Sequence, residues 1–289
     1  MTAPRAKRVP EPVDLFAGTE PPAPIEGIRV GIGGWTYAPW RSNFYPAGLV
    51  QRRELEYASR RLSTIEINGT FYGAQQPAIY ARWAAETPDG FMFSLKAPQY
   101  VTQRGALAKA GGAAQAFVTG GLAEFGGKLG PILWQLAPSR AFDRDDLAAF
   151  LDALPRVLDG QPLRHVLEVR HDSFRDPGYV ELARAHRIAT VFTDSPDYPS
   201  LADITGEFVY ARLMRSRVDI VTGYAETELD QWAGHAREWA AGGDPGALPH
   251  VVAARAPGTA REVFINFISA AKQRNPAAAI ALIERLRAH

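Results

Sequence analysis

Beginning near Gly27, the chain alternates short strand-like segments with segments that have helical spacing or loop composition. The strand-like segments are rich in β-branched and aromatic residues, and several alternate apolar with polar side chains, as half-buried strands do. We predict strands at residues 28–33, 64–68, 91–96, 131–136, 164–170, 189–194, 208–213 and 263–267. We predict helices at residues 51–62, 106–119, 145–158, 228–241 and 276–287, and two more that begin at Pro77 and Pro177.

Eight strand-and-helix units without an internal linker predict a single TIM-like (β/α)8 barrel of the α/β class, and 289 residues are within the usual length of one. A doubly wound open sheet is the alternative. Against it, no G-x-G-x-x-G turn follows a predicted strand, and Gly31-Ile32-Gly33-Gly34 leads into aromatic residues rather than a helix.

The start of the chain differs from the rest in composition. Residues 1–26 are rich in Pro and Ala and contain no apolar segment of signal-peptide length. We predict a flexible Pro-rich N-terminal arm at residues 1–26 and the barrel domain at residues 27–289. The short patch Val13-Asp14-Leu15-Phe16 in the arm is a candidate for docking on the domain surface.

The overall charge is nearly balanced, with 32 basic and 31 acidic residues and a net charge of +1. No global field therefore attracts nucleic acid or an anionic membrane, although a local basic groove stays open as an alternative. The absence of cysteine excludes disulfides, thiolate metal sites and a cysteine nucleophile. Nowhere do about 20 apolar residues follow one another. We expect a soluble, cytoplasmic protein with no membrane association.

In a (β/α)8 barrel the carboxyl ends of all strands meet at one mouth, where barrel enzymes keep their active sites. Many predicted strands end here on a polar or charged residue, and aromatic residues surround them. The polar set is Glu66, Asn68, Lys96, Gln135, Glu168, Arg170, Asp194, Arg212 and Asn266, and the aromatic set is Trp35, Tyr37, Trp40 and Tyr72. For any one of these charges, a structural ion pair is a more common explanation than catalysis. Their convergence from several strands favours a polar binding site.

Two kinds of chemistry suit these charges. Glu66 and Glu168 are candidates for an acid and base pair, although their strands lie far apart around the barrel, whereas a glycosidase needs its carboxylates about 5 to 9.5 Å apart. The cations Lys96, Arg170 and Arg212 are candidates for binding a phosphate or carboxylate. The alternative is that these cations neutralise Glu66, Glu168 and Asp194.

Two further features have competing explanations. His171 follows Arg170 and is a candidate metal ligand with Glu168 or Asp194, but strand parity points it away from Glu168, which favours a positioning role. We therefore predict neither a metal nor a cofactor. The rim aromatics suit stacking on a sugar or base, and packing of the barrel lip explains them about as well.

We assign catalysis to Glu66, Glu168, Lys96 and Asp194, and ligand binding to Asn68, Tyr37, Trp40, Tyr72, Gln135, Arg170, Arg212 and Asn266.

The motifs at these strand ends also resemble a known family. Gly34-Trp35-Thr36-Tyr37, Glu66-Ile67-Asn68 and Glu168-Val169-Arg170-His171 occur in the order found in the YecE-like family, known as domain of unknown function 72. The likeness continues through Trp40, Phe44-Tyr45-Pro46, Thr70-Phe71-Tyr72, Trp83, Lys96, Phe174, Asp194 and Arg212. It implies a TIM-like barrel and does not imply a reaction.

The chain departs from the family pattern at two places. Gln103 follows Thr102 where the family has histidine, and the segment from Arg212 to Arg217 replaces a usual His-Gly turn and adds positive charge.

Our leading hypothesis for the function is an enzyme acting on a small polar molecule, anionic or sugar-like. The alternatives are a nucleic-acid-binding or nucleic-acid-acting barrel that uses Arg215, Arg217 and the rim aromatics, and a non-catalytic ligand-binding protein.

Overall fold

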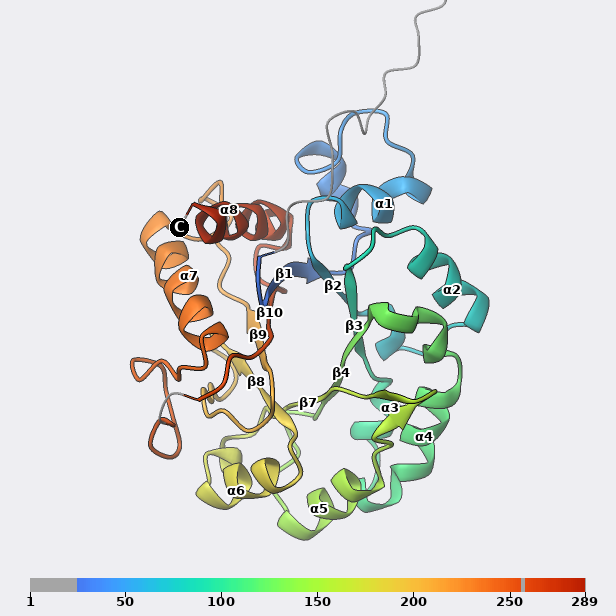
Figure 1. Ribbon diagram of the computed structural model, residues 1–289, viewed down its shortest axis with the longest axis vertical. Coiled ribbons are helices and arrows are strands. Elements are labelled where there is room, and N and C mark those ends of the chain that lie inside the picture. Colours follow the sequence, from blue (N-terminus) through green and yellow to red (C-terminus); the bar gives the residue numbers. More distant parts are fainter. Residues whose placement is uncertain (1–24, 256–257, 289) are drawn as a thin grey trace, which may run out of the picture.

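The computed structural model describes residues 25–255 and 258–288. Most of the predicted N-terminal arm, including its candidate docking patch at residues 13–16, lies outside the described residues. The described part contains one closed barrel of eight parallel strands in the order β1-β10-β9-β8-β7-β4-β3-β2, and β1 pairs with both β2 and β10 to close it. This architecture confirms the predicted TIM-like (β/α)8 fold (Figure 1).

The barrel strands follow the predicted ones closely. They are β1 Ile28–Gly33, β2 Thr64–Ile67, β3 Met92–Lys96, β4 Leu129–Gln135, β7 His165–Glu168, β8 Ala189–Thr193, β9 Val209–Leu213 and β10 Val263–Phe267. The α-helices are α1 Glu54–Ser59, α2 Pro77–Ala85, α3 Gln99–Thr102, α4 Gly111–Thr119, α5 Arg144–Ala153, α6 Pro177–Ala185, α7 Glu226–Ala240 and α8 Asn275–Arg287. Short 3-10 helices are η1 Ala38–Ser42, η2 Gln51–Arg53, η3 Gly69–Phe71, η4 Leu107–Lys109, η5 Leu122–Lys128, η6 Asp172–Phe174 and η7 Lys272–Arg274.

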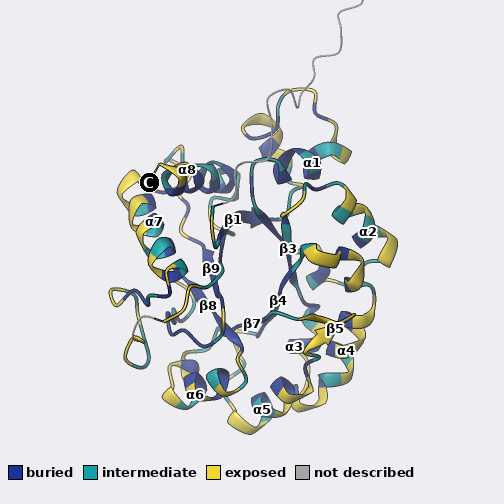
Figure 2. Cartoon of the chain, in the orientation of Figure 1, coloured by how far each residue is buried: buried dark blue, intermediate teal, exposed yellow. Residues whose placement is uncertain are grey.

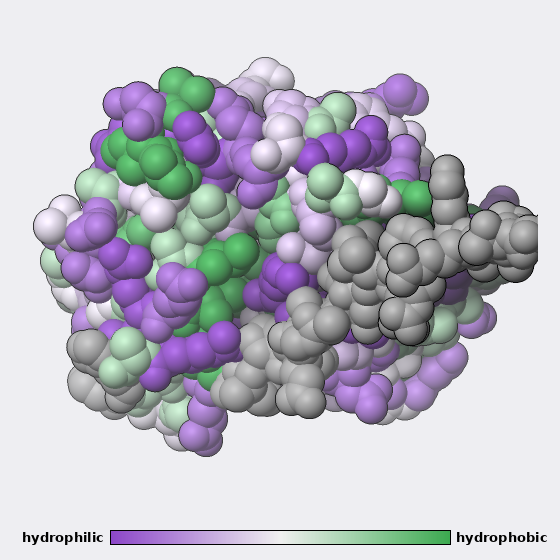
Figure 3. All heavy atoms as spheres, turned by 90° about the horizontal axis from the view of Figure 1, so that it is seen from above, coloured by the Kyte–Doolittle hydropathy of each residue, from purple (hydrophilic) through white to green (hydrophobic). Residues whose placement is uncertain are grey.

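The helices surround the barrel, and their burial follows from that position. Their inner faces and the strands are buried, whereas their outer faces are exposed (Figure 2). On the face seen from above in Figure 1, small hydrophobic patches are separated by hydrophilic side chains (Figure 3). None of the described helices is long and apolar enough to cross a membrane.

The helix predicted at residues 51–62 is shorter in the structure, where η2 is followed by α1, which ends at Ser59. A second predicted helix also ends earlier than expected. The pattern predicts a helix at residues 145–158, but α5 ends at Ala153. Pro155 explains the early end, because a residue before proline avoids the helical conformation, and Leu154 is extended with ψ 130°. A small hairpin follows, in which β5 (Val157–Leu158) pairs with β6 (Gln161–Pro162) across Asp159 and Gly160. Both turn residues have positive φ, of 48° and 77°, as tight hairpin turns require.

The interior of the barrel has an apolar part and a polar part. A cluster of buried side chains fills the part toward the amino ends of the strands: Leu133, Val166, Ala189, Val191, Phe208, Tyr210 and Phe264, with Met92 against it. On several strands the residue two positions later is polar, as in the pairs Val166 and Glu168, Tyr210 and Arg212, and Phe264 and Asn266. Because alternate residues of a strand face the same side, these polar side chains also point into the barrel, nearer its mouth.

Glycine makes room where two strands approach closely. A Cβ atom at Gly31 of β1 would lie 1.9 Å from the carbonyl oxygen of Thr64 on β2. No side chain fits there without moving a strand, so Gly31 permits β1 and β2 to pack closely beside Thr64.

Candidate functional site

A buried charge network crosses the barrel at its mouth. The Arg212 guanidinium, on β9, lies between the carboxylates of Glu66 on β2 and Glu168 on β7, and all three side chains are at most 2% exposed. Arg212 donates to Glu66 from Nε and Nη2, at 3.0 Å each, and to Glu168 from Nη1 at 2.7 and 2.8 Å. The arginine fork thus binds both carboxylates at once, which fixes all three side chains.

Arg170 extends this network toward the rim. It donates from Nε and Nη2 to Oε1 of Glu168 at 3.2 and 2.9 Å, and from Nη1 to the Tyr198 hydroxyl at 3.2 Å. Its guanidinium also lies over the Tyr198 ring, 4.1 Å from the centroid. At the inner end, the Tyr210 hydroxyl donates to Oε2 of Glu66 at 2.9 Å. We call Glu66, Arg212, Glu168 and Arg170 the charge network.

The environment of the network keeps Glu168 and Arg212 ionised. Burial raises the pKa of Glu168, but Arg212, Arg170 and Lys96 outweigh it and hold this pKa below its ordinary value. Burial likewise lowers the pKa of Arg212, yet Glu168 and Glu66 outweigh it and raise this pKa. Burial, together with the Glu66 carboxylate, raises the pKa of Tyr210 well above its ordinary value. Glu168 is therefore an anion at neutral pH and Tyr210 is a neutral phenol.

Lys96 at the end of β3 has a different environment. Its Nζ atom lies 3.7 Å from the centroid of the Phe71 ring, and none of the described carboxylates is within ion-pair distance of it. Burial, the largest cause, and the charges of Arg212 and Arg170 lower the pKa of Lys96 to about 8, partly offset by Glu66 and Glu168. This amine therefore loses its proton at a lower pH than an exposed lysine does. The side chain is only partly buried, so solvent reaches it.

Several buried polar atoms near the network lack hydrogen-bond partners among the described residues. The amide of Asn266 is fully buried on β10 and has no partner for either of its polar atoms, and Oε1 of Gln135 on β4 is also unpartnered. Buried polar groups normally have partners, so this end of the barrel suits a polar molecule.

The rim aromatics lie in different environments. Trp40 is fully buried, and its Nε1 donates to the Lys272 carbonyl at 2.9 Å. Tyr37 is half-buried and meets Trp40 edge-on at 5.3 Å, with Lys272 Nζ 4.7 Å above its ring. Tyr72 is 80% exposed and contacts Phe71 edge-on at 5.6 Å. The structure does not bring these three rings together on one surface, and the burial of Trp40 favours a packing role for it.

Asn68 and Asp194 lie at the ends of their strands but outside the charge network. Asn68 directly follows β2 and is half-buried beside Gly33, where an added Cβ would lie 2.7 Å from its Nδ2. Asp194 accepts from the Met214 backbone N–H through Oδ1 and from the Tyr224 hydroxyl through Oδ2 at 2.9 Å. Burial raises the pKa of Asp194, and its hydrogen bonds offset part of that rise. Asp194 thus anchors the chain after β9.

Beside Asp194 is a separate cavity next to α7, with a volume of about 500 Å³. Arg215, one of the residues that depart from the family pattern, lines this cavity and is exposed. Arg217 is also exposed and forms an ion pair with Glu228. The added positive charge therefore lies beside α7 rather than in the charge network.

The other departure from the family pattern is Gln103, which follows Thr102. The contacts of Thr102 and of His171 are local. Thr102, which precedes Gln103, donates from Oγ1 to the Gln135 carbonyl at 2.6 Å and so ties α3 to β4. The backbone N–H of Ser173 donates to His171 Nδ1 at 3.2 Å, which starts η6. Within residues 25–255 and 258–288 no group of three or more His, Asp or Glu side chains is arranged to hold a metal ion.

Sequence reasoning did not single out two residues of the site. Tyr210 precedes Arg212 by two positions, so the parity of β9 was a usable signal for a side chain pointing into the barrel. Tyr198 lies in an irregular segment between β8 and β9, and nothing in its sequence surroundings indicates that it meets Arg170.

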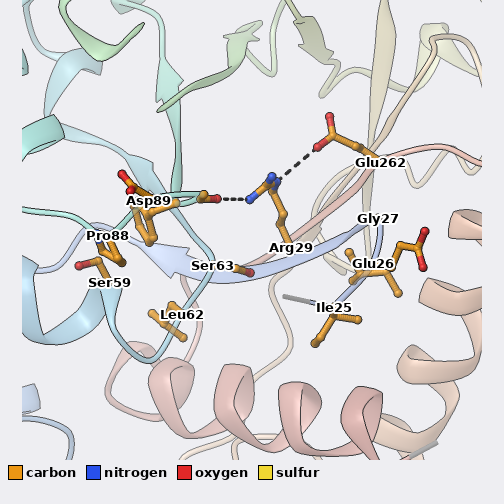
Figure 4. A pocket seen from close by; sticks show the side chains of 13 residues that line it. Ile25, Glu26, Gly27, Arg29, Ser59, Leu62, Ser63, Pro88, Asp89 and Glu262 are labelled. Carbon is orange, nitrogen blue, oxygen red and sulfur yellow. Dashed lines mark hydrogen bonds and ion pairs between the residues drawn. The ribbon is translucent and has the colours of Figure 1, made fainter. Parts of the chain in front are cut away.

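A pocket of about 240 Å³ lies at the opposite, amino-terminal end of β1 (Figure 4). Arg29 lines it and donates to the Gly90 carbonyl at 2.6 Å and to Glu262 at 3.4 Å. This end of a (β/α)8 barrel contributes stability rather than catalysis, so we do not take the pocket as the functional site.

The fold and the charge network define a (β/α)8-barrel protein with a buried charge network toward the carboxyl ends of its strands. The chain belongs to the family described as "Protein of unknown function DUF72", whose model matches residues 29–288. This match confirms the resemblance found in the sequence.

Three relatives illustrate the relationship. The UPF0759 protein YunF of Bacillus subtilis (strain 168) is 30% identical over 82 residues, which span 28% of each chain. A DUF72 family protein from Thermotoga maritima MSB8 has a similar structure, with a TM-score of 0.68 and 18% identity, over 91% of this chain and 99% of that one. One from Enterococcus faecalis V583 has a TM-score of 0.65 and 15% identity, over 90% and 95%. At these identities the structural likeness supports the fold alone.

Proposed function

We propose that this protein is an enzyme that acts on a small polar substrate, anionic or sugar-like, at the carboxyl-terminal mouth of its barrel. One observation carries the proposal: the charge network together with Lys96 holds one more positive than negative group. The charge network contains two carboxylates and two guanidinium groups, and protonated Lys96 adds a cation without a carboxylate within ion-pair distance among the described residues. An anionic group of a substrate would compensate this charge.

The contacts favour different roles for the candidate residues. Glu66 and Glu168 are fully engaged with Arg212, and the lowered pKa of Glu168 makes it a poor proton donor. We therefore assign to the charge network the fixed electrostatic field of the site, which stabilises charge without reorganisation. Lys96 is the group left to act on the substrate, and Gln135 and Asn266 are left to orient it through their unpartnered atoms.

The aromatic and nucleic-acid hypotheses receive less support from the contacts. Trp40 is buried in the core, and Arg217 is paired with Glu228, so a continuous surface of stacking rings and free cations is absent among the described residues. We do not propose nucleic acid as the substrate.

A turnover screen tests the proposal. The purified protein is incubated with a mixture of small carboxylates, phosphates and sugars, and their consumption is followed by mass spectrometry. We expect at least one compound to be consumed by the protein and by Lys109→Met, an exposed control, but not by Lys96→Met. Equal consumption by Lys96→Met and the unaltered protein would contradict the proposed site, and no consumption of any compound would contradict the proposed activity.

A further inference from the structure

The position of Lys96 points to a more specific chemistry than charge compensation. Its amine lies at the carboxyl end of β3, is reachable from solvent, and rests on the Phe71 ring rather than on a carboxylate. A paired lysine keeps its proton and cannot attack, whereas a lysine without a paired carboxylate and beside guanidinium groups loses its proton readily. The two carboxylates that act electrostatically on Lys96, those of Glu66 and Glu168, are held by Arg212 instead.

From this arrangement we propose that Lys96 forms an imine with a small aldehyde or ketone that carries an anionic group, such as a 2-oxo acid. The inference rests on the proposed function, since it names the substrate class for the same site. Lysine amines in partly apolar surroundings are the side chains that form Schiff bases with carbonyl substrates.

The step balances without any further reactant. The neutral Nζ forms a bond to the carbonyl carbon, and the π pair of the carbonyl moves onto its oxygen, which takes up the proton that the nitrogen releases. Water then leaves as the C=N bond forms, so one amine and one carbonyl compound give one imine and one water. The imine nitrogen then takes up a proton from solvent, equivalent to the one that the ammonium group gave up before the attack, so the protonated imine carries one positive charge next to the anionic group of the substrate.

The surroundings of Lys96 suit both the attack on the carbonyl carbon and the later loss of water. The charge network and Lys96 together carry one excess positive charge, which a single carboxylate on the substrate offsets. Oε1 of Gln135, on the strand next to β3, is a buried acceptor without a partner among the described residues. It is available to accept from the hydroxyl of the carbinolamine or from the N–H of the protonated imine.

Reductive trapping tests the inference directly. The full chain is incubated with pyruvate, and separately with glyoxylate, in the presence of sodium cyanoborohydride, and the adduct is mapped by peptide mass spectrometry. The chain has only five lysines, Lys7, Lys96, Lys109, Lys128 and Lys272, so the site is assigned unambiguously. We expect one reduced adduct, on Lys96, and a trapping rate that rises with pH and levels off above about 8.

Variants separate charge from nucleophilicity. Lys96→Arg keeps the positive charge but has no amine, so we expect it to give no adduct, while Lys109→Met is trapped like the unaltered protein. Adducts spread evenly over the five lysines, an unchanged adduct level in Lys96→Arg, or no adduct on Lys96 with either probe would each overturn the inference.

The inference and the proposed function fail in different ways. If Lys96→Met loses turnover of a metabolite but Lys96 is never trapped, the imine is wrong and the proposed function stands. If Lys96 is trapped but no metabolite is consumed, the amine is reactive as inferred and the proposed enzymatic function is wrong.

Discussion

Arg212 depends on its two carboxylates, because a guanidinium that is 2% exposed has lost nearly all of its hydration. We expect Glu168→Gln to lower the free energy of unfolding at pH 7 by about 3–5 kcal/mol, since it leaves Arg212 and Arg170 undercompensated in the interior. Urea denaturation measures this change. Glu207→Gln, which breaks the exposed ion pair with Arg187, is the control and should cost less than about 1 kcal/mol. If both substitutions lower the free energy of unfolding by a similarly small amount, Arg212 does not depend on Glu168.

The same carboxylate gives the stability a pH dependence in acid. The pKa of Glu168 is lower in the folded protein than its ordinary value, so its contribution is present above the ordinary pKa of about 4.3 and is lost as the pH falls through the folded value. Glu168→Gln should therefore lose less stability between pH 5 and pH 3 than the unaltered protein.

Lys96 should have the opposite effect on stability. Its pKa is lowered from 10.5 to about 8, so the folded state disfavours the ammonium form. We expect Lys96→Met to raise the free energy of unfolding at pH 7 by roughly 1–3 kcal/mol, because one pKa unit corresponds to about 1.4 kcal/mol. The gain is complete below pH 8 and disappears as the pH rises to 10.5, where the unfolded chain also loses its proton. A loss of stability in Lys96→Met, with the exposed Lys109→Met unchanged, would show that Lys96 is structural.

The sequence indicated which charges reach the mouth but not how they pair. Strand parity and the position of Glu66, Glu168 and Arg212 near the ends of their strands suffice to predict that they point into the barrel. That one guanidinium lies between two carboxylates from distant strands depends on the closure and stagger of the barrel, which local patterns do not encode. Trp40 illustrates the same limit, because an aromatic residue in a loop gives no local signal of complete burial.

At the scale of elements, Asp194 connects β8 to the segment between β9 and α7. Asp194→Ala removes its hydrogen bonds with the Met214 backbone and the Tyr224 hydroxyl. We expect the free energy of opening this segment to fall by about 1–2 kcal/mol. Trypsin should then cut after the exposed Arg215 or Arg217 about tenfold faster. Mass spectrometry of the fragments measures the rate, and Asp197→Ala, at an exposed position, is the control. Equal cleavage of the two variants would mean that Asp194 does not anchor the segment.

The positions of most elements were predictable from periodicity, and the exceptions have local causes. The helix predicted at residues 145–158 ends early because the prediction gave more weight to its apolar spacing than to Pro155, which was visible in the sequence. The hairpin of β5 and β6 has only two residues in each strand, too few for an alternating pattern to emerge. Neither error affects the mouth, because both lie after β4 and before the amino end of β7.

At the scale of the whole molecule, the net charge of +1 says little about binding, because the excess positive charge of the charge network and Lys96 is local. If an anion binds there, folded protein is favoured by mass action, and the thermal midpoint rises with ligand concentration. Sulfate is a suitable probe because its charge does not change between pH 6 and pH 10. We expect its affinity to be constant below about pH 8 and to fall by up to tenfold per pH unit above it, as Lys96 loses its proton.

Variants at Lys96 decide whether this linkage is real. Lys96→Arg keeps its charge over the whole range, so sulfate should stabilise it equally at pH 7 and pH 9.5, whereas sulfate should barely stabilise Lys96→Met at either pH. Sulfate also strengthens burial of apolar surface in any protein, and Lys96→Met measures that general effect so that it can be subtracted. If sulfate raises the thermal midpoint of Lys96→Met as much as that of the unaltered protein, the mouth does not bind anions. If the rise in the unaltered protein is the same below and above about pH 8, Lys96 is not the cation that titrates.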